Sequence, residues 1–146
     1  MTGRRAPTWL TFANRINRPL LRRGFGPRPQ HLLVVEGRKS GVVRATPIAV
    51  LEQAGARYLV AGFDGADWIK NVRHQGGRAV LQRGARREHV MLLELPVGER
   101  APILRAFARK VRGGRAFVTV APDAPDHDFV TASPLHPVFR IGDRRD

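Results

Sequence analysis

The sequence predicts a mostly β protein of the α+β class, an antiparallel barrel of about six strands decorated by helices. Three observations predict this class. Short apolar runs bounded by glycine are typical of strands, tight turns join several neighbouring runs, and the regular strand–helix alternation of a parallel sheet is absent. The length of 146 residues is enough for one packed core. Because the chain has no cysteine, disulfides, thiolate nucleophiles and cysteine-ligated metal sites are excluded.

We divide the chain into a basic amphipathic helix with a connector over 1–30, a main domain over 31–142 and a tail over 143–146. In the first segment apolar side chains recur at near-helical spacing, Thr8 is a suitable N-cap and Pro19 ends or kinks the helix. This helix packs across the domain, or it lies on a membrane surface or covers an active site. Since no run of about 18–20 apolar residues and no secretory signal occurs, we expect a cytoplasmic protein, with peripheral membrane contact through the helix as an alternative.

The main domain begins with three predicted strands. The β-branched run 31–36 and its hairpin partner 42–51 are separated by the turn 37–41, and the third strand, 57–61, follows a turn at 54–55. Pro47 lies inside the second strand and has no N–H to donate. It therefore predicts an edge position or a bulge there.

A short helix and two more strands follow. Asp64, or Gly65 as a weaker choice, can cap a helix that runs through Trp68 and ends at Gly76–Gly77. The segments 78–82 and 88–95 then predict two strands separated by a turn at Gly84.

The clearest helix is predicted over 98–112, where apolar residues recur at spacings of one, three and four before the stop at Gly113–Gly114. Another apolar run covers 116–120. The Pro- and Asp-rich stretch 121–128 predicts a loop, and 136–141 predicts the last strand.

The chain is strongly basic, with 26 Lys and Arg against 12 Asp and Glu and a formal charge of +14. Positive charge of this size is the usual footprint of a nucleic-acid-binding module, which we keep as one hypothesis. Against it, only 7% of the residues are aromatic, no nucleic-acid-binding motif occurs, and 23 of the 26 cations are arginine, a bias that GC-rich coding alone produces.

The densest chemical signal is the turn Gly37-Arg38-Lys39-Ser40-Gly41. A glycine-flanked turn exposes backbone N–H groups, and two cations with a hydroxyl complete the parts of a phosphate cradle. It is not a P-loop, because Arg38 stands where glycine would precede the lysine and a strand rather than a helix follows. Arg44 can add a second guanidinium to the same anion. The alternative is a solvated basic hairpin tip.

A second signal covers 61–72. Small residues at the end of a strand let a flat ring lie against the backbone, and Trp68 and Asn71 on the following helix could wall that ring. For Trp68 taken by itself, a position in the core is the better interpretation. The five histidines show no metal-binding spacing and neither serine lies in a Gly-x-Ser-x-Gly motif, so we expect neither a metal site nor a serine hydrolase. The cluster Asp123, Asp126, His127 and Asp128 is typical of a solvated loop.

Four motifs in consistent order carry a resemblance to a known family, which spans roughly residues 10–141. They are Gly37-Arg-Lys-Ser-Gly-x-x-Arg44-x-x-Pro47-Ile48, Val60-Ala-Gly62 with Gly65, Trp68-x-x-Asn71-Val72, and His136-Pro-Val-Phe-Arg-Ile141. Together they resemble the deazaflavin-dependent nitroreductase family. That family has the split β-barrel, flavin-reductase-like fold related to pyridoxamine-phosphate oxidases, so the resemblance implies this fold here.

The resemblance implies an oxidoreductase that transfers a hydride from reduced deazaflavin coenzyme F-420 to an electron-poor acceptor such as a quinone, an enone or a nitroaromatic compound. The cofactor carries the chemistry, so no catalytic side chain is required. The resemblance implies that Arg38, Lys39, Ser40 and Arg44 hold the anionic phosphate and oligoglutamate tail. It implies that the ring is backed by Pro47, Ile48, Ala61, Gly62 and Phe63, and that Trp68 and Asn71 fix the adjoining helix. The implied cofactor-binding residues are Arg38, Lys39, Ser40, Gly41, Arg44, Thr46, Pro47, Ile48, Ala61, Gly62, Phe63, Gly65, Trp68 and Asn71. FMN or another ring ligand bound without turnover is the alternative.

The chain also departs from the family pattern. Only Ala66-Asp67 separates Gly65 from Trp68, so the loop is shorter than usual, and Phe63 stands where a small polar residue is common. The tyrosine cluster of relatives that reduce bulky acceptors is missing from 128–135. The polar candidates that remain for the pocket of a lipophilic or aromatic acceptor are His127, Thr131, Ser133 and His136. We expect a monomer or a homodimer.

Overall fold

The computed structural model describes residues 31–111 and 113–143. The helix predicted within residues 1–30 lies outside this described part. Within it, no helix is long and apolar enough to cross a membrane.

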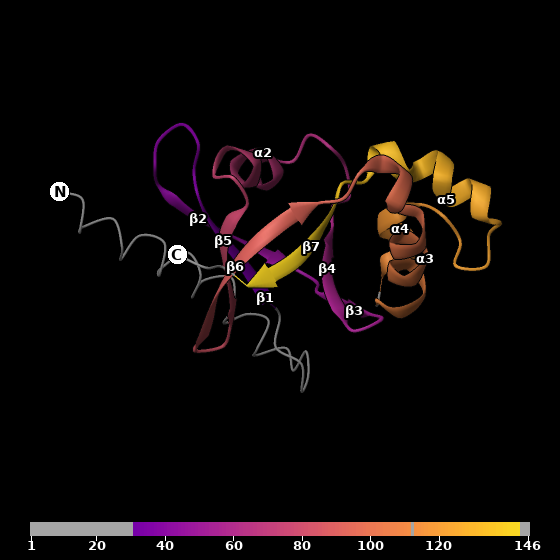
Figure 1. Cartoon of the computed structure of the whole chain (residues 1–146), viewed down its shortest axis with the longest axis horizontal. Coiled ribbons are helices and arrows are strands. Elements are labelled where there is room, and N and C mark those ends of the chain that lie inside the picture. The colour runs from indigo at the N-terminus through magenta and orange to yellow at the C-terminus, as the bar shows by residue number, and fades with distance from the viewer. Residues whose placement is uncertain (1–30, 112, 144–146) are drawn as a thin grey trace. The chain divides into compact units, whose positions relative to one another are not determined.

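Seven strands form one sheet in the order β2-β1-β5-β6-β7-β4-β3 (Figure 1). The pairs β1–β2, β1–β5, β3–β4, β4–β7 and β5–β6 all run antiparallel. The predicted mostly antiparallel α+β class is therefore confirmed. The strands are β1 His31–Glu36, β2 Val43–Ile48, β3 Leu51–Gln53, β4 Ala56–Val60, β5 Arg78–Arg83, β6 Arg86–Glu94 and β7 Val138–Asp143.

The described residues fall into two compact units. The first unit holds 31–48, 70–91 and residue 143, and the second holds 49–69 and 92–142. Strand β6 and helix α2, Asp67–His74, each run from one unit into the other.

In the first unit β1 lies between β2 and β5, and its side chains alternate between two faces. One face forms a small apolar cluster of Leu32, Val34, Ala45 and Val80. Strand β2 lies at the edge of the sheet. Proline, which has no N–H to donate to a neighbouring strand, is tolerated at such an edge. The edge position predicted from Pro47 is confirmed.

The single strand predicted over 42–51 is wrong, because the chain forms two strands there. Strand β2 ends at Ile48 and pairs with β1, whereas β3 begins at Leu51 and pairs with β4. The interruption lets Leu51 join the buried apolar cluster of the second unit. The predicted turn at 54–55 is confirmed, with positive φ at both Ala54 and Gly55, as a type I′ hairpin turn requires.

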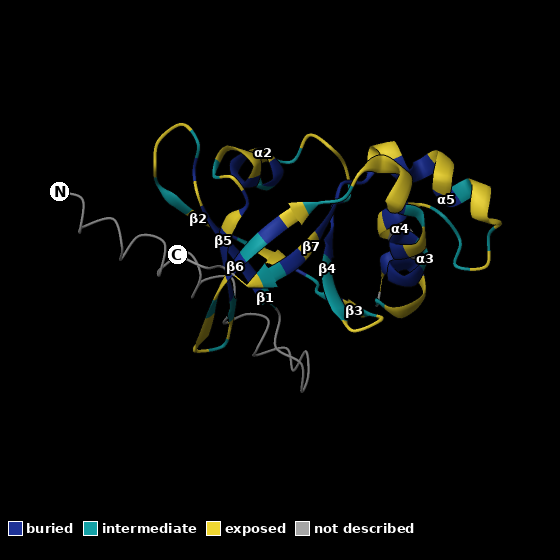
Figure 2. Ribbon diagram, in the orientation of Figure 1, coloured by how far each residue is buried: buried dark blue, intermediate teal, exposed yellow. Residues whose placement is uncertain are grey.

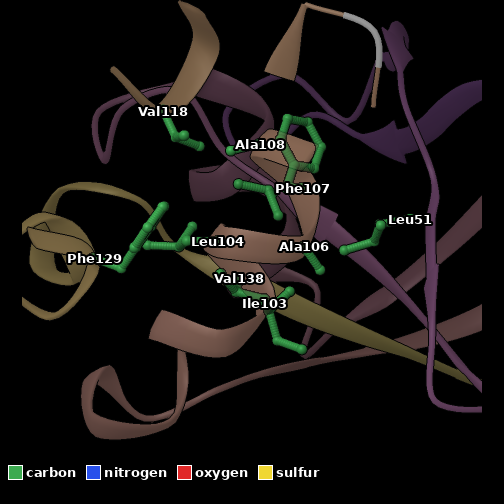
Figure 3. Close-up of a cluster of buried hydrophobic side chains, with 10 residues drawn as sticks. Leu51, Ile103, Leu104, Ala106, Phe107, Ala108, Val118, Phe129 and Val138 are labelled. Carbon is green, nitrogen blue, oxygen red and sulfur yellow. The ribbon is translucent and has the colours of Figure 1, made fainter. Parts of the chain in front are cut away.

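The predicted helix over 98–112 is confirmed in a shorter form, as α3 Ala101–Lys110 after a 3-10 turn at Val97–Glu99. It buries Ile103, Leu104 and Phe107 in the cluster shown in Figure 3. The apolar run that follows forms the five-residue helix α4, Gly114–Val118, and Val118 is fully buried.

The loop predicted over 121–128 is wrong at its end, because helix α5 covers Asp126–Ala132. Two physical reasons favour the helix. Asp126 and Asp128 lie in the first turn, where the helix dipole stabilises negative charge, and Phe129 and Ala132 are buried one turn apart. Arg105 of α3 also pairs with Asp126, and its guanidinium lies over the Phe129 ring.

Several further boundaries differ from the prediction. Strand β4 lies one residue earlier than 57–61, β5 ends one residue later than 82, and β6 covers Arg86–Glu94 rather than 88–95. Helix α2 begins at Asp67, so neither Asp64 nor Gly65 is its N-cap as predicted, because these two residues make a separate turn. The predicted end at Gly76–Gly77 is confirmed by positive φ at both glycines. Strand β7 begins two residues later than predicted, after Pro137, which has no N–H to donate.

Candidate functional site

The turn 37–41, which we call the basic turn, is closed by backbone hydrogen bonds. Gly37 N–H donates to Val42 O at 2.8 Å, and Gly41 N–H donates to Gly37 O at 3.0 Å. Gly41 has φ +73°, and a Cβ at Gly37 would lie only 3.0 Å from the Val42 carbonyl oxygen. Both glycines are therefore needed for this tight turn.

Cationic and hydroxyl side chains gather at the basic turn. Lys39, Ser40 and Arg44 are exposed, as Figure 2 shows for the turn that follows β1. The Arg44 Nε lies 3.6 Å from the place that a Cβ at Gly37 would occupy, so this side chain reaches the turn from β2. The predicted approach of Arg44 to the turn is confirmed. The Ser40 Oγ accepts a 3.2 Å hydrogen bond from Val42 N–H and keeps its own hydroxyl hydrogen to donate.

Asn71 of α2 fastens the basic turn from inside the first unit. Its Oδ1 accepts hydrogen bonds from the backbone N–H of Arg38 at 3.0 Å and from the Arg38 Nη1 at 2.8 Å. The Asn71 side chain is buried, with 4% of the residue exposed. One amide oxygen thus fixes both the main chain and the guanidinium of Arg38.

Strand β2 divides the remaining predicted residues of the first unit between two faces. Arg44, Thr46 and Ile48 share one face, because side chains alternate along a strand. Pro47 lies on the opposite face, next to Leu32 in the register with β1. The side chains of Pro47 and Ile48 therefore do not back the same surface.

In the second unit the residues Ala61–Gly65, which we call the glycine loop, follow the end of β4. Ala61 N–H donates to Pro137 O at 2.9 Å, and the Ala61 carbonyl faces the Nδ1 of buried His136 at 2.9 Å. A carbonyl oxygen only accepts, so this contact assigns the ring proton to Nδ1. Hydrogen bonds at both the N–H and the carbonyl group of Ala61 thus hold the loop at its first residue.

Two phenyl rings lie against the glycine loop. The Cε1 and Cζ atoms of Phe117 are each 3.0 Å from the place that a Cβ at Gly62 would occupy. Phe63 lies over Gly65 in the same way, with Cε2 and Cδ2 at 3.5 and 3.6 Å. Sequence reasoning missed Phe117, and the only signal for it was the apolar run at 116–120.

Trp68 is half-buried and packs against Phe139, with ring centroids 5.7 Å apart and planes tilted by 54°. This contact agrees with the interpretation of Trp68 as a packing residue. It also places the start of α2 against strand β7 within the second unit.

The four predicted acceptor-pocket residues form two hydrogen-bonded pairs, His127 with Thr131 and Ser133 with His136, whose N–H donates to Ser133 O at 3.3 Å. Exposed His127 pairs with its neighbour Asp128 at 3.0 Å, and the Thr131 hydroxyl donates to the His127 carbonyl on the same helix. The buried Ser133 hydroxyl donates to Phe129 O. Of the four, His136 is the one bonded to the glycine loop.

The donor chemistry of these two places differs. The basic turn presents ammonium, guanidinium, hydroxyl and backbone groups, which suit phosphate or carboxylate oxygens. The glycine loop presents backbone and aromatic surface, which suits a flat ring.

One family model matches most of the chain. The family model described as F420H(2)-dependent quinone reductase matches residues 12–119. No curated protein matches the chain.

Three solved structures are similar in fold. One is described as an F420-H2 dependent reductase (FDR-A), with 24% identity over 78% of this chain and 94% of that chain and a TM-score of 0.53. Another, described as a domain-swapped dimer, has 21% identity over 90% of this chain and 98% of that chain, with a TM-score of 0.54. A conserved hypothetical protein, Rv2991 from Mycobacterium tuberculosis, has 15% identity over 80% and 73% and a TM-score of 0.51.

Proposed function

The chain belongs to the F420H(2)-dependent quinone reductase family, and we propose that its basic turn and glycine loop hold the cofactor of that family's reaction. The protein is an oxidoreductase that transfers a hydride from reduced coenzyme F-420 to an electron-poor organic acceptor. Family membership decides between the alternative cofactors in favour of F-420 over FMN. For the acceptor we propose a quinone.

The observation that carries the proposal is the convergence of donors at the basic turn. Lys39, Ser40 and Arg44 present exposed donors at one glycine-closed turn, and Arg38 is held by Asn71 beneath them. Donors of this kind bind the phosphate and carboxylate oxygens of an anionic cofactor tail through charge-assisted hydrogen bonds. We assign the tail to this turn, with Thr46 and Ile48 extending the same face of β2.

We assign the cofactor ring to the glycine loop. The small residues Ala61 and Gly62 allow close approach of a flat ring to the backbone. The hydrogen bonds of Ala61 to Pro137 and His136 keep that backbone in place. When bound, reduced F-420 supplies a hydride, which carries two electrons. A quinone that accepts this hydride and one proton from solvent becomes a hydroquinone. The chain itself orients the reactants and limits the access of water.

The test is a fluorescence titration with oxidised F-420. We expect saturable binding by the wild type, and a Kd raised by about tenfold or more in the double variant Lys39→Ala with Arg44→Ala, because each lost charged hydrogen bond is worth about 1.5–3 kcal/mol. FMN serves as the parallel ligand.

The matched control is Arg83→Ala with Arg86→Ala. It removes the same charge from exposed positions of the first unit, at the turn between β5 and β6. Equal weakening in both double variants would show that diffuse charge, and not the basic turn, binds the cofactor. A wild type that does not bind F-420 would overturn the assignment altogether.

The split-barrel fold, the assembly and the location extend this proposal. Similarity in fold to a reductase structure supports the split β-barrel assignment. The assembly is a monomer or a homodimer, and light scattering on the purified full chain distinguishes the two. We propose a cytoplasmic protein, and flotation with lipid vesicles tests peripheral membrane contact.

A further inference from the structure

Phe117 is 44% exposed, and two atoms of its ring lie 3.0 Å from the position that a Cβ at Gly62 would occupy. The ring lies on the side of Gly62 from which a side chain would project. The opposite side of the Gly62 backbone is not covered by this contact.

Helix α4, which carries Phe117, packs closely on α3. A Cβ at Gly114 would lie 2.3 Å from the Phe107 carbonyl oxygen, so only glycine permits this approach. At the other end of α4, Val118 is fully buried. The Phe107 ring lies beneath Phe117, with centroids 5.4 Å apart and planes tilted by 37°. Packing of this kind leaves few rotamers to a side chain.

Phe63 adds a second exposed ring from the loop itself. It is 62% exposed and lies over Gly65. Two phenyl rings from segments far apart in the sequence therefore lie against two glycines of one five-residue loop. Each ring offers an apolar surface with an electron-rich face beside the loop.

We propose that Phe117 and Phe63 form an aromatic platform that binds the acceptor and selects flat, conjugated molecules such as quinones. This inference rests on the proposed function, in which the glycine loop holds the cofactor ring. Hydride transfer requires reacting atoms about 3–3.5 Å apart, so the acceptor has to lie beside the ring that the loop holds. Phe63 belongs to this loop and the Phe117 ring of α4 lies against it, so a planar quinone can stack on either ring face to face or edge to face.

The experiment measures steady-state kinetics with reduced F-420 and two acceptors, 2-methyl-1,4-naphthoquinone and 2-cyclohexen-1-one. Phe117→Ala raises KM for the naphthoquinone by about tenfold, which corresponds to about 1.4 kcal/mol, and leaves kcat within about threefold. KM for the small, non-aromatic enone changes by less than about twofold, because little stacking surface is lost. Phe63→Ala acts in the same direction. Since its ring is outside the buried core, this variant stays folded if Phe117→Ala does not.

Three controls separate this inference from the proposed function. Leu135→Ala removes an equally exposed apolar side chain, 62% exposed, from the same unit and leaves both KM values unchanged. Fluorescence titration gives the same Kd for oxidised F-420 in wild type and in Phe117→Ala. Equilibrium dialysis of the naphthoquinone against protein loaded with oxidised F-420 shows the loss of acceptor binding without turnover.

Each outcome has one meaning. An unchanged naphthoquinone KM in both Phe variants overturns the platform while the proposed function stands. A Kd for F-420 that rises with the naphthoquinone KM also overturns it, and assigns the rings to the cofactor instead. Failure of the wild type to bind F-420 overturns the proposed function itself.

Discussion

At the scale of single residues, Asn71 shows how one buried side chain organises an exposed site. Its amide oxygen accepts two hydrogen bonds from Arg38, one from the main chain and one from the guanidinium. Exposed cations have many rotamers, and fixing the main chain beneath them lowers the entropy lost on binding an anion. Asn71 therefore acts on the basic turn without facing the ligand.

Replacing Asn71 by alanine leaves both Arg38 donors without this acceptor. We expect the free energy of unfolding to fall by about 1–3 kcal/mol, and the Kd for F-420 to rise, since the turn is no longer held. Urea unfolding and the fluorescence titration measure the two effects. Asn71→Asp keeps Oδ1 and should retain most of the affinity, whereas His74→Ala, at an exposed position on the same helix, should change neither quantity. Unaltered F-420 affinity in Asn71→Ala would contradict this role.

At the scale of elements, the join between α3 and α4 depends on two adjacent glycines for different reasons. Gly113 has φ +79° and nothing near its Cβ position, so it is required by backbone conformation. Gly114 has no positive φ, and its Cβ position is blocked by Phe107 O at 2.3 Å, so it is required by packing. The position of the short helix that carries Phe117 thus depends on the backbone conformation of Gly113 and on the close packing at Gly114.

These two glycines should respond differently to substitution. Gly113→Asn should cost little stability, because asparagine tolerates the left-handed conformation and open space surrounds the site. Gly114→Ala should lower the free energy of unfolding by about 1–3 kcal/mol or more, because α4 has to move away from α3. It should also raise KM for the naphthoquinone by displacing Phe117. Thermal and urea unfolding compare the two variants, and equal losses would contradict the packing argument.

At the scale of the whole molecule, charge is divided unevenly between the two units. Among the described residues the first unit has nine Lys and Arg against three Asp and Glu, and the second has seven against eight. The anionic cofactor tail is assigned to the basic unit, and the uncharged acceptor to the nearly neutral one. The excess charge of the first unit should therefore act on cofactor binding and not on the acceptor.

Salt should separate these two binding events. The Debye length shortens from about 30 Å at 0.01 M salt to about 8 Å at 0.15 M, so the Kd for F-420 should rise several-fold over this range. KM for the naphthoquinone should stay within about twofold, because its contacts are apolar. A DNA oligonucleotide in parallel tests the nucleic-acid alternative, since binding through many phosphates weakens by about 10³-fold or more between 0.05 and 0.2 M salt. Equal salt dependence of the two constants would contradict this division.

The sequence by itself determined the features that depend on local chemistry. The strands at 31–36 and 57–61, the turn at 54–55, the edge position of Pro47 and the helix around Ile103 and Phe107 follow from apolar periodicity and from the conformational limits of glycine and proline. The basic turn was also visible, because its glycines, cations and hydroxyl are consecutive. These signals act over a few residues, and so a local pattern is enough to predict them.

Only the tertiary structure decided the rest, because those features depend on contacts between distant segments. The break between β2 and β3 follows from Leu51 joining a separate apolar cluster, and α5 is favoured by the burial of Phe129 and the pairing of Asp126 with Arg105. The contact of Phe117 with Gly62 joins residues that no local pattern relates. The role of such a side chain depends on backbone that is distant in the sequence. The spacing of residues along the chain does not show which distant segments come into contact.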